Sequence, residues 1–124
     1  MGEVLFKEES YKIIGCCLEV YNELGPGFLE VIYKDALEIE FQLNEIPYSR
    51  EKIFDIKYKN KLLPRRYQAD FVVYDKIILE VKHFRTLSSD NLAQTLNYLK
   101  VTGCKLGILA NFGEGSFNSK RIIF

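Results

Sequence analysis

The chain has 124 residues, of which 48% are hydrophobic and 27% charged, a composition typical of a folded globular domain. Seventeen basic and seventeen acidic residues give no net charge, which weighs against nucleic-acid binding driven by overall charge. No apolar run approaches the roughly 18 residues of a membrane-spanning helix. We therefore expect one domain over residues 1–124 with no membrane partner. Its three cysteines are odd in number and lack metal-ligand spacing, which favours a reducing, cytoplasmic location.

The first part of the chain predicts two helices. Residues 8–24 repeat apolar side chains at helical spacing, and Gly25-Pro26 ends the pattern. Cys16 and Cys17 fall within it, where we expect small buried apolar residues. Residues 29–44 predict a second helix with two apolar rows. These rows are Ile32, Ala36, Ile39 and Leu43, and Tyr33, Leu37 and Phe41.

The pattern then changes to the alternation typical of strands. The expected elements are strands over 51–59, 65–74 and 76–84, a helix from 88–90 to 101, and strands over 104–111 and 120–124. The order α-α-β-β-β-α-β-β predicts a single α/β domain with a mixed sheet flanked by helices. Because a helix connects the third and fourth strands, we expect these two to be parallel.

The stretch "QADFVVYDKIILEVK" predicts two strands, yet Asp70, Glu80 and Lys82 interrupt its apolar pattern. Glu80 and Lys82 are two apart and therefore share one face of the strand. Asp70 lies directly opposite Glu80 only if the hairpin has an odd-length loop centred on Asp75, or one bulge. A regular two-residue turn would separate the carboxylates.

The two carboxylates, if they meet, predict a cation site. Asp70 and Glu80 would repel each other in a poorly solvated site unless a cation lay between them. Oxygen ligands suit Mg²⁺, with Mn²⁺ also suitable. Lys82 would orient a water molecule or neutralise charge on a phosphate. The alternative is a surface ladder of ion pairs, which predicts an exposed sheet face.

A second group of charges occupies "KYKNKLLPRR", residues 57–66, which has five basic residues and no acidic one. Either this is a solvated hairpin or its edge contacts phosphates.

Several motifs resemble those of one nuclease superfamily. Asp70 followed by Glu80-Val81-Lys82 resembles the D…(D/E)xK signature of the PD-(D/E)xK superfamily, which implies a restriction-endonuclease-like αβββαβ core. "GFLEVIY" matches the motif that names the GxxExxY protein family within that superfamily. "LGPGFLEVIYKDAL", "ADFVV", "LEVK" and "AQTLNYLKVTG…LGILANFG" follow in the expected order. The resemblance extends from about Ile13 to the C-terminus.

The resemblance implies roles for the charged residues. Asp70, Glu80 and the Val81 carbonyl would bind the metal, and Lys82 would orient the attacking water. Glu30 would be an accessory ligand from the second helix. Its alternative role is that of an acidic residue favoured by the helix dipole.

The resemblance also implies residues near the substrate. "QTLNY" is similar to the QxxxY element of RecB-type nuclease domains, so Gln94 and Tyr98 are predicted to contact substrate or Lys82. A polar helix face is the alternative. Tyr33 and Arg66 complete the predicted substrate-binding set. Asn91 stands where family members often carry a histidine.

These expectations together predict a Mg²⁺-dependent nuclease that hydrolyses phosphodiester bonds of DNA. The alternative is a catalytically inactive module with the same fold that binds nucleic acid or protein. A homodimer or an unidentified protein partner is compatible with either. The single histidine, His83, lies on the opposite strand face from Lys82, where we expect a structural or surface role.

Overall fold

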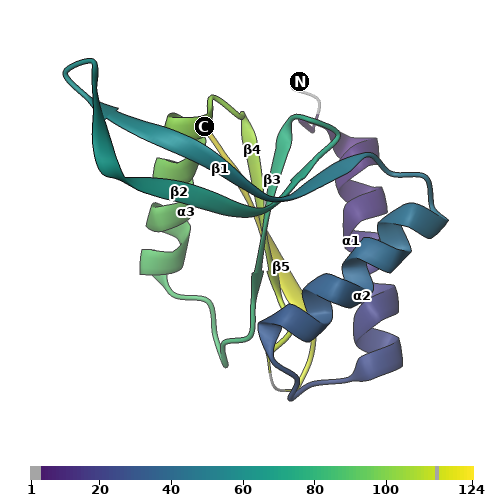
Figure 1. Cartoon of the computed structure of the whole chain (residues 1–124). Coiled ribbons are helices and arrows are strands. Elements are labelled where there is room, and N and C mark those ends of the chain that lie inside the picture. Colours follow the sequence, from purple (N-terminus) through teal and green to yellow (C-terminus); the bar gives the residue numbers. More distant parts are fainter. Residues whose placement is uncertain (1–3, 114) are drawn as a thin grey trace.

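The computed structural model describes residues 4–113 and 115–124, which form three helices and one five-stranded sheet (Figure 1). The elements are α1 (Lys7–Leu24), α2 (Glu30–Leu43), β1 (Tyr48–Tyr58), β2 (Lys61–Val73), β3 (Ile77–Lys82), α3 (Ser89–Thr102), β4 (Leu106–Asn111) and β5 (Asn118–Ile123). The predicted α/β class and element order are confirmed. Residues 1–3 of the expected domain and Glu114 of the expected last turn lie outside the described residues.

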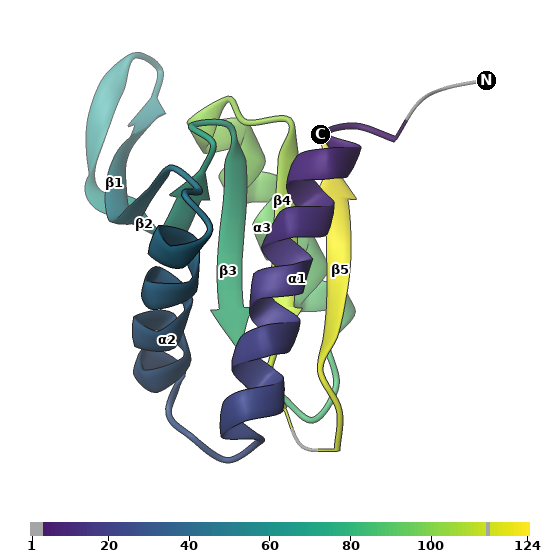
Figure 2. The same cartoon turned by 90° about the vertical axis from the view of Figure 1, so that its right-hand side faces the viewer.

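The sheet has the strand order β1-β2-β3-β4-β5, and β3 and β4 are parallel as predicted. The other neighbouring strands are antiparallel. Helices α1 and α2 cover one face of the sheet and α3 covers the other (Figure 2). None of the helices in the described part of the chain is long and apolar enough to cross a membrane.

The structure selects which apolar residues of the helices form the core. Tyr33, Leu37 and Phe41 of α2 are fully buried, whereas Ile39 and Leu43 from the other row are exposed. Cys16 and Cys17 of α1 are buried as predicted. Burial raises the pKa of the Cys16 thiol to about 11, so this thiol stays protonated at neutral pH.

Strand β2 changes face at Asp70. Ala69 packs in the apolar cluster on the α3 side, whereas Phe71, two residues later, packs in the cluster formed with α1 and α2. Residues two apart in a regular strand share a face, so the strand must twist or bulge between them. On the neighbouring strand, Glu51 has a positive φ of 57° at the same level. The sheet is therefore irregular where the predicted carboxylate lies.

The segment after β3 is held by a close backbone contact. The buried side chain of Asn111 accepts a hydrogen bond from the Phe84 N–H and donates one to the Phe84 carbonyl, both at 2.9 Å. Gly113 lies so close that an added Cβ would overlap the Phe84 carbonyl. This contact fixes the chain immediately beyond Lys82.

We predict that Gly113→Ala destabilises the protein by about 2–4 kcal/mol, because backbone must move to admit the methyl group. This corresponds to a melting temperature lower by roughly 5 °C or more in thermal denaturation. Gly15→Ala is the matched control, since Gly15 lies within α1 with nothing near its Cβ position and should gain up to about 1 kcal/mol. Equal melting temperatures for the two variants would contradict the close contact.

Candidate functional site

The β2–β3 hairpin has the odd-length loop that the site requires. Val73 pairs with Ile77, so three residues centred on Asp75 form the loop. Continuing the same register places Asp70 opposite Glu80. The predicted hairpin register is therefore confirmed.

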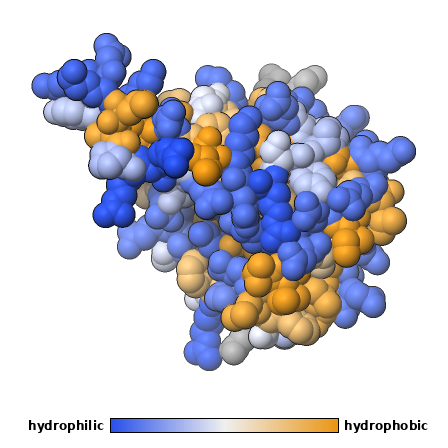
Figure 3. Space-filling view, in the orientation of Figure 1, coloured by the Kyte–Doolittle hydropathy of each residue, from blue (hydrophilic) through white to orange (hydrophobic). Residues whose placement is uncertain are grey.

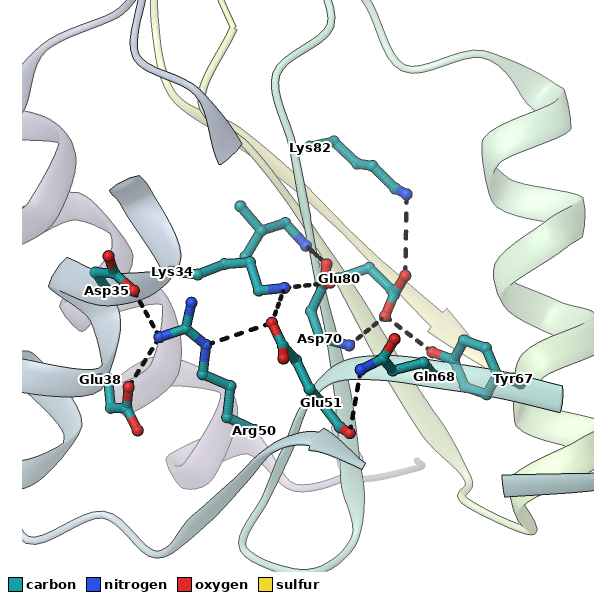
Figure 4. Close-up of polar contacts among 11 residues, drawn as sticks. Lys34, Asp35, Glu38, Arg50, Glu51, Tyr67, Gln68, Asp70, Glu80 and Lys82 are labelled. Atoms are coloured by element: carbon teal, nitrogen blue, oxygen red, sulfur yellow. Dashed lines mark hydrogen bonds and ion pairs between the residues drawn. The ribbon is translucent and has the colours of Figure 1, made fainter. Parts of the chain in front are cut away.

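Further from the hairpin loop the two strands separate. There the side-chain carboxylates of Asp70 and Glu80, rather than backbone carbonyls, accept hydrogen bonds from the opposite strand. The regular pairing of β2 and β3 ends at Phe71 and Leu79. The Asp70 N–H then donates to Glu80 Oε2 at 3.0 Å, and the Val81 N–H donates to Asp70 Oδ2 at 2.7 Å (Figure 4). Each carboxylate is thus bound to a peptide N–H of the opposite strand. Peptide groups of the sheet therefore help to position the pair.

Glu80 is a buried acid. Its exposed fraction is 4%, and its Oε2 also accepts a hydrogen bond from the Tyr67 hydroxyl at 2.9 Å. The other oxygen, Oε1, faces the Lys82 ammonium at 3.9 Å. Burial, together with the negative charge of Asp70, raises the pKa of Glu80 to about 7. The surface-ladder alternative predicted an exposed face and is wrong for Glu80.

Lys34 of α2 is a member of the site that the sequence did not indicate. Its Nζ lies 3.1 Å from Asp70 Oδ1 and 3.1 Å from Glu51 Oε1. Burial by itself would lower the pKa of Lys34, but the hydrogen bonds to Asp70 and Glu51 raise it overall. Lys34 is therefore a charged partner of Asp70. The available signal was its position four residues after Glu30, on the same face of the helix.

Arg50 ties α2 to β1 beside this lysine. Its Nη1 lies 2.7 Å from Asp35 Oδ1 and 2.9 Å from Glu38 Oε2 (Figure 4). These ion pairs fix the helix against the sheet and therefore fix the place from which Lys34 reaches Asp70.

Glu30 is not brought into contact with the carboxylate pair. It lies one helical turn before Lys34, and its Oε2 is 4.0 Å from His83 Nε2. Within residues 4–113 and 115–124, no group of three or more His, Cys, Asp or Glu side chains is placed to hold a metal ion. The role of Glu30 as an accessory ligand stays a prediction.

The predicted substrate contact of Tyr33 is corrected by its burial. The side chain is fully buried, and its hydroxyl donates to the Gly25 carbonyl at 2.7 Å and accepts from the Phe28 N–H at 3.2 Å. Its ring stacks on Phe112 at 4.5 Å between centroids. A side chain with no exposed surface does not reach a substrate. Tyr33 instead fixes the loop between α1 and α2.

Tyr98 of α3 reaches the site through a second tyrosine. Its ring stacks on that of Tyr67 with centroids 3.8 Å apart and planes 13° apart, and Tyr67 in turn holds Glu80. Sequence reasoning missed Tyr67, although it lies three residues before Asp70 on the same strand. Asn91 caps α3 together with Ser88.

Two other predicted substrate-binding residues lie on the surface. Gln94 is exposed, and its side chain forms no hydrogen bond with the described part of the chain. Arg66 is exposed on the outer part of β2, four residues before Asp70, and pairs in register with Asp55 of β1. Neither contacts the carboxylates, so their roles stay predictions.

The donors that meet here fit a hard divalent cation. Asp70 and Glu80 supply carboxylate oxygens, and Glu80 Oε1 has no hydrogen bond from the described residues. Mg²⁺ is commonly held by one or two carboxylates, with water and substrate phosphates completing its shell. A buried carboxylate next to another negative charge, as Glu80 is next to Asp70, also gains stability when a cation neutralises it.

We predict that Glu80→Gln stabilises the protein in the presence of a chelator, and more so at high pH. The pKa of Glu80 is about 7 in the folded chain against an ordinary 4.5, so folding favours its neutral form. The stability that the neutral Glu80 side chain provides is complete below about pH 4.5 and is lost as the pH rises through 7. The free energy of unfolding of the wild-type protein falls by about 3 kcal/mol over this range. Glutamine keeps an oxygen for Tyr67 and the Asp70 N–H.

Melting temperatures at pH 5 and pH 8 test this. The variant should exceed the wild-type protein at pH 8, and the difference should shrink at pH 5. Glu19→Gln, on the exposed face of α1, is the control and should show no such change between the two pH values. A Glu80→Gln variant that is less stable than wild type at pH 8 would contradict the assignment.

Comparison with known proteins identifies the family. The solved crystal structure of SSO0001 is similar to this chain with 21% identity and a TM-score of 0.59, over 76% of this chain and 50% of that one. This likeness shows a restriction-endonuclease-like fold, and the chain spans about half the length of that protein. A search of the curated proteins finds no match. The model of the PD-(D/E)XK nuclease superfamily matches residues 7–122, and the chain belongs to that superfamily.

Proposed function

We propose that the protein is a Mg²⁺-dependent nuclease that hydrolyses phosphodiester bonds of DNA, with Mn²⁺ also accepted. We further propose one nuclease-like domain over residues 1–124, membership of the GxxExxY family and a cytoplasmic location. Proteins of this superfamily typically use divalent metals. The observation that supports catalysis is the interlocked pair of Asp70 and Glu80 with Lys82 beside it.

Asp70, Glu80 and the Val81 carbonyl are the proposed metal ligands. The Val81 N–H points towards Asp70, and the N–H and C=O of one strand residue point to the same side, so its carbonyl faces the same region. Glu30 would act from further out, through a water molecule. The bound ion supplies Lewis acidity and lowers the pKa of a coordinated water.

Lys82 acts on the reacting groups. Its ammonium shares a strand face with Glu80 and lies 3.9 Å from Oε1. From there it would orient the attacking water and stabilise negative charge that develops on the phosphate. Tyr67, supported by Tyr98, keeps the Glu80 carboxylate in place.

A second candidate is a module that binds nucleic acid or protein without turnover. The contact between Lys34 and Asp70 favours it, because the ammonium already neutralises a carboxylate that a metal would need. The exposed apolar row of α2, which includes Ile39 and Leu43, is the surface on which a second copy or another protein would pack.

We predict that the protein cleaves linear or circular DNA with Mg²⁺ or Mn²⁺, and that Asp70→Ala and Lys82→Ala each reduce the rate by 100-fold or more, on the order of other essential groups in such sites. Gel assays of the purified variants measure this. Lys12→Ala and Glu19→Ala, both on the exposed face of α1, should retain the wild-type rate. Cleavage that survives both site substitutions would indicate a contaminant. Binding without any cleavage would support the second candidate.

We also predict that Lys34→Met binds Mn²⁺ several-fold more tightly than the wild-type protein, because it removes an ammonium that competes for Asp70 Oδ1. The metal-free variant should melt at a lower temperature, since Asp70 loses its partner. Isothermal titration calorimetry and thermal denaturation measure the two effects. Lys12→Met is the control. Weaker Mn²⁺ binding by Lys34→Met would show that the lysine assists the site rather than competing for it.

A further inference from the structure

The hairpin of β1 and β2 extends beyond the body of the molecule as a two-stranded ribbon (Figure 1). We define its outer part, residues 57–66, as the basic arm. Every residue of the arm is exposed. Pairing continues to the tip, where Tyr58 pairs with Lys61. The turn residues Lys59 and Asn60 both have positive φ, 48° and 64°, as the tight turns that match strand twist require.

Charge is distributed unevenly between the arm and the body. The arm carries five basic residues and no acidic one, and hydrophilic residues cover its tip in Figure 3. Taking these five from the 17 basic residues leaves 12 against 17 acidic residues in the rest of the chain. None of the five forms an ion pair with a residue that the structure describes. An acidic body repels phosphates, so the arm is the part of the surface suited to bind them.

The arm is also positioned relative to the carboxylate pair, because both belong to β2. Lys61 and Asp70 are nine positions apart on β2, a span of at most roughly 30 Å in an extended strand. One helical turn of duplex DNA is about 34 Å long, and its major groove admits a two-stranded β-ribbon.

We propose that the basic arm binds the phosphate backbone of duplex DNA about one helical turn away from the bond at the carboxylate site. This inference rests on the proposed nuclease function for the position of that bond, but the binding itself needs no turnover. It assigns duplex DNA longer than one turn as the substrate class. Lysine and proline on an exposed strand also prevent edge-to-edge aggregation, and Pro64 lies in the arm. Protection from aggregation alone predicts no effect on DNA affinity.

The test compares the wild-type protein with Lys57→Gln/Lys59→Gln/Lys61→Gln. Fluorescence anisotropy measures the affinity for a labelled 30-base-pair duplex at several salt concentrations. A chelator is present, so that binding is measured without cleavage. Each lost phosphate contact lowers the slope of log affinity against log salt by roughly 0.9, so the slope should fall by about 2 to 3, with affinity at least about tenfold weaker. Lys7→Gln/Lys12→Gln/Lys120→Gln removes the same charge from exposed positions elsewhere and should change the slope little.

The length of the DNA supplies a second comparison. A duplex of 8 base pairs, shorter than one turn, cannot reach from the arm to the carboxylate site, so the wild-type protein should bind it more weakly than the 30-base-pair duplex. An arm variant with the wild-type slope, or a control variant with an equal loss, overturns the proposal, as does a wild-type protein that binds no duplex at low salt. If the arm variant loses as much slope and affinity on a single strand of 30 nucleotides as on the duplex, the assignment of duplex DNA is overturned. If the arm variant shows the expected lower slope but the wild-type protein never cleaves DNA, the nuclease function is contradicted and the arm remains a DNA-binding element.

Discussion

The exchange of hydrogen bonds between two carboxylates and the peptide groups of opposite strands is the interaction on which the site depends. Where the pairing of β2 and β3 ends, unpaired peptide N–H groups inside the protein would be costly, and Asp70 and Glu80 satisfy them. The same bonds hold the buried carboxylate of Glu80 close to the partly exposed carboxylate of Asp70. The carboxylates thus stabilise the fold through these hydrogen bonds and destabilise it through charge repulsion. A group that neutralises the charge is therefore needed beside them.

Helices on opposite faces of the sheet supply that support. From α2, Lys34 places its ammonium on Asp70, and Arg50 fixes the helix to β1. From α3, Tyr98 stacks on Tyr67, whose hydroxyl donates to Glu80. Asp70 is therefore paired with a cation, whereas Glu80 accepts two hydrogen bonds and has a pKa raised by burial and by Asp70. These contacts hold the site together without a bound metal. They leave Oε1 of Glu80 without a hydrogen bond from the described residues and so free to bind a cation.

The sequence predicted this site as far as local periodicity and spacing reach. The ten-residue interval from Asp70 to Glu80 predicted an odd-length hairpin loop, which the structure has. Lys34 and Tyr67 were missed because their importance arises only when α2 and β3 pack against β2, and neither breaks the pattern of its own element. Tyr33 was misassigned for a related reason. A motif position shows that a residue matters, but burial decides whether it supports the fold or faces a substrate.

The role of the QxxxY element changes once Tyr67 is included. Tyr98 does not contact a carboxylate directly, and its stacked partner separates it from Glu80. Removing the Tyr98 ring would leave Tyr67 less restrained, so the effect on Glu80 would be one of position rather than of charge. Gln94, one turn earlier on α3, has no such intermediate and faces solvent. Tyr98 therefore contacts the site through Tyr67 inside the protein, whereas Gln94 is exposed to solvent.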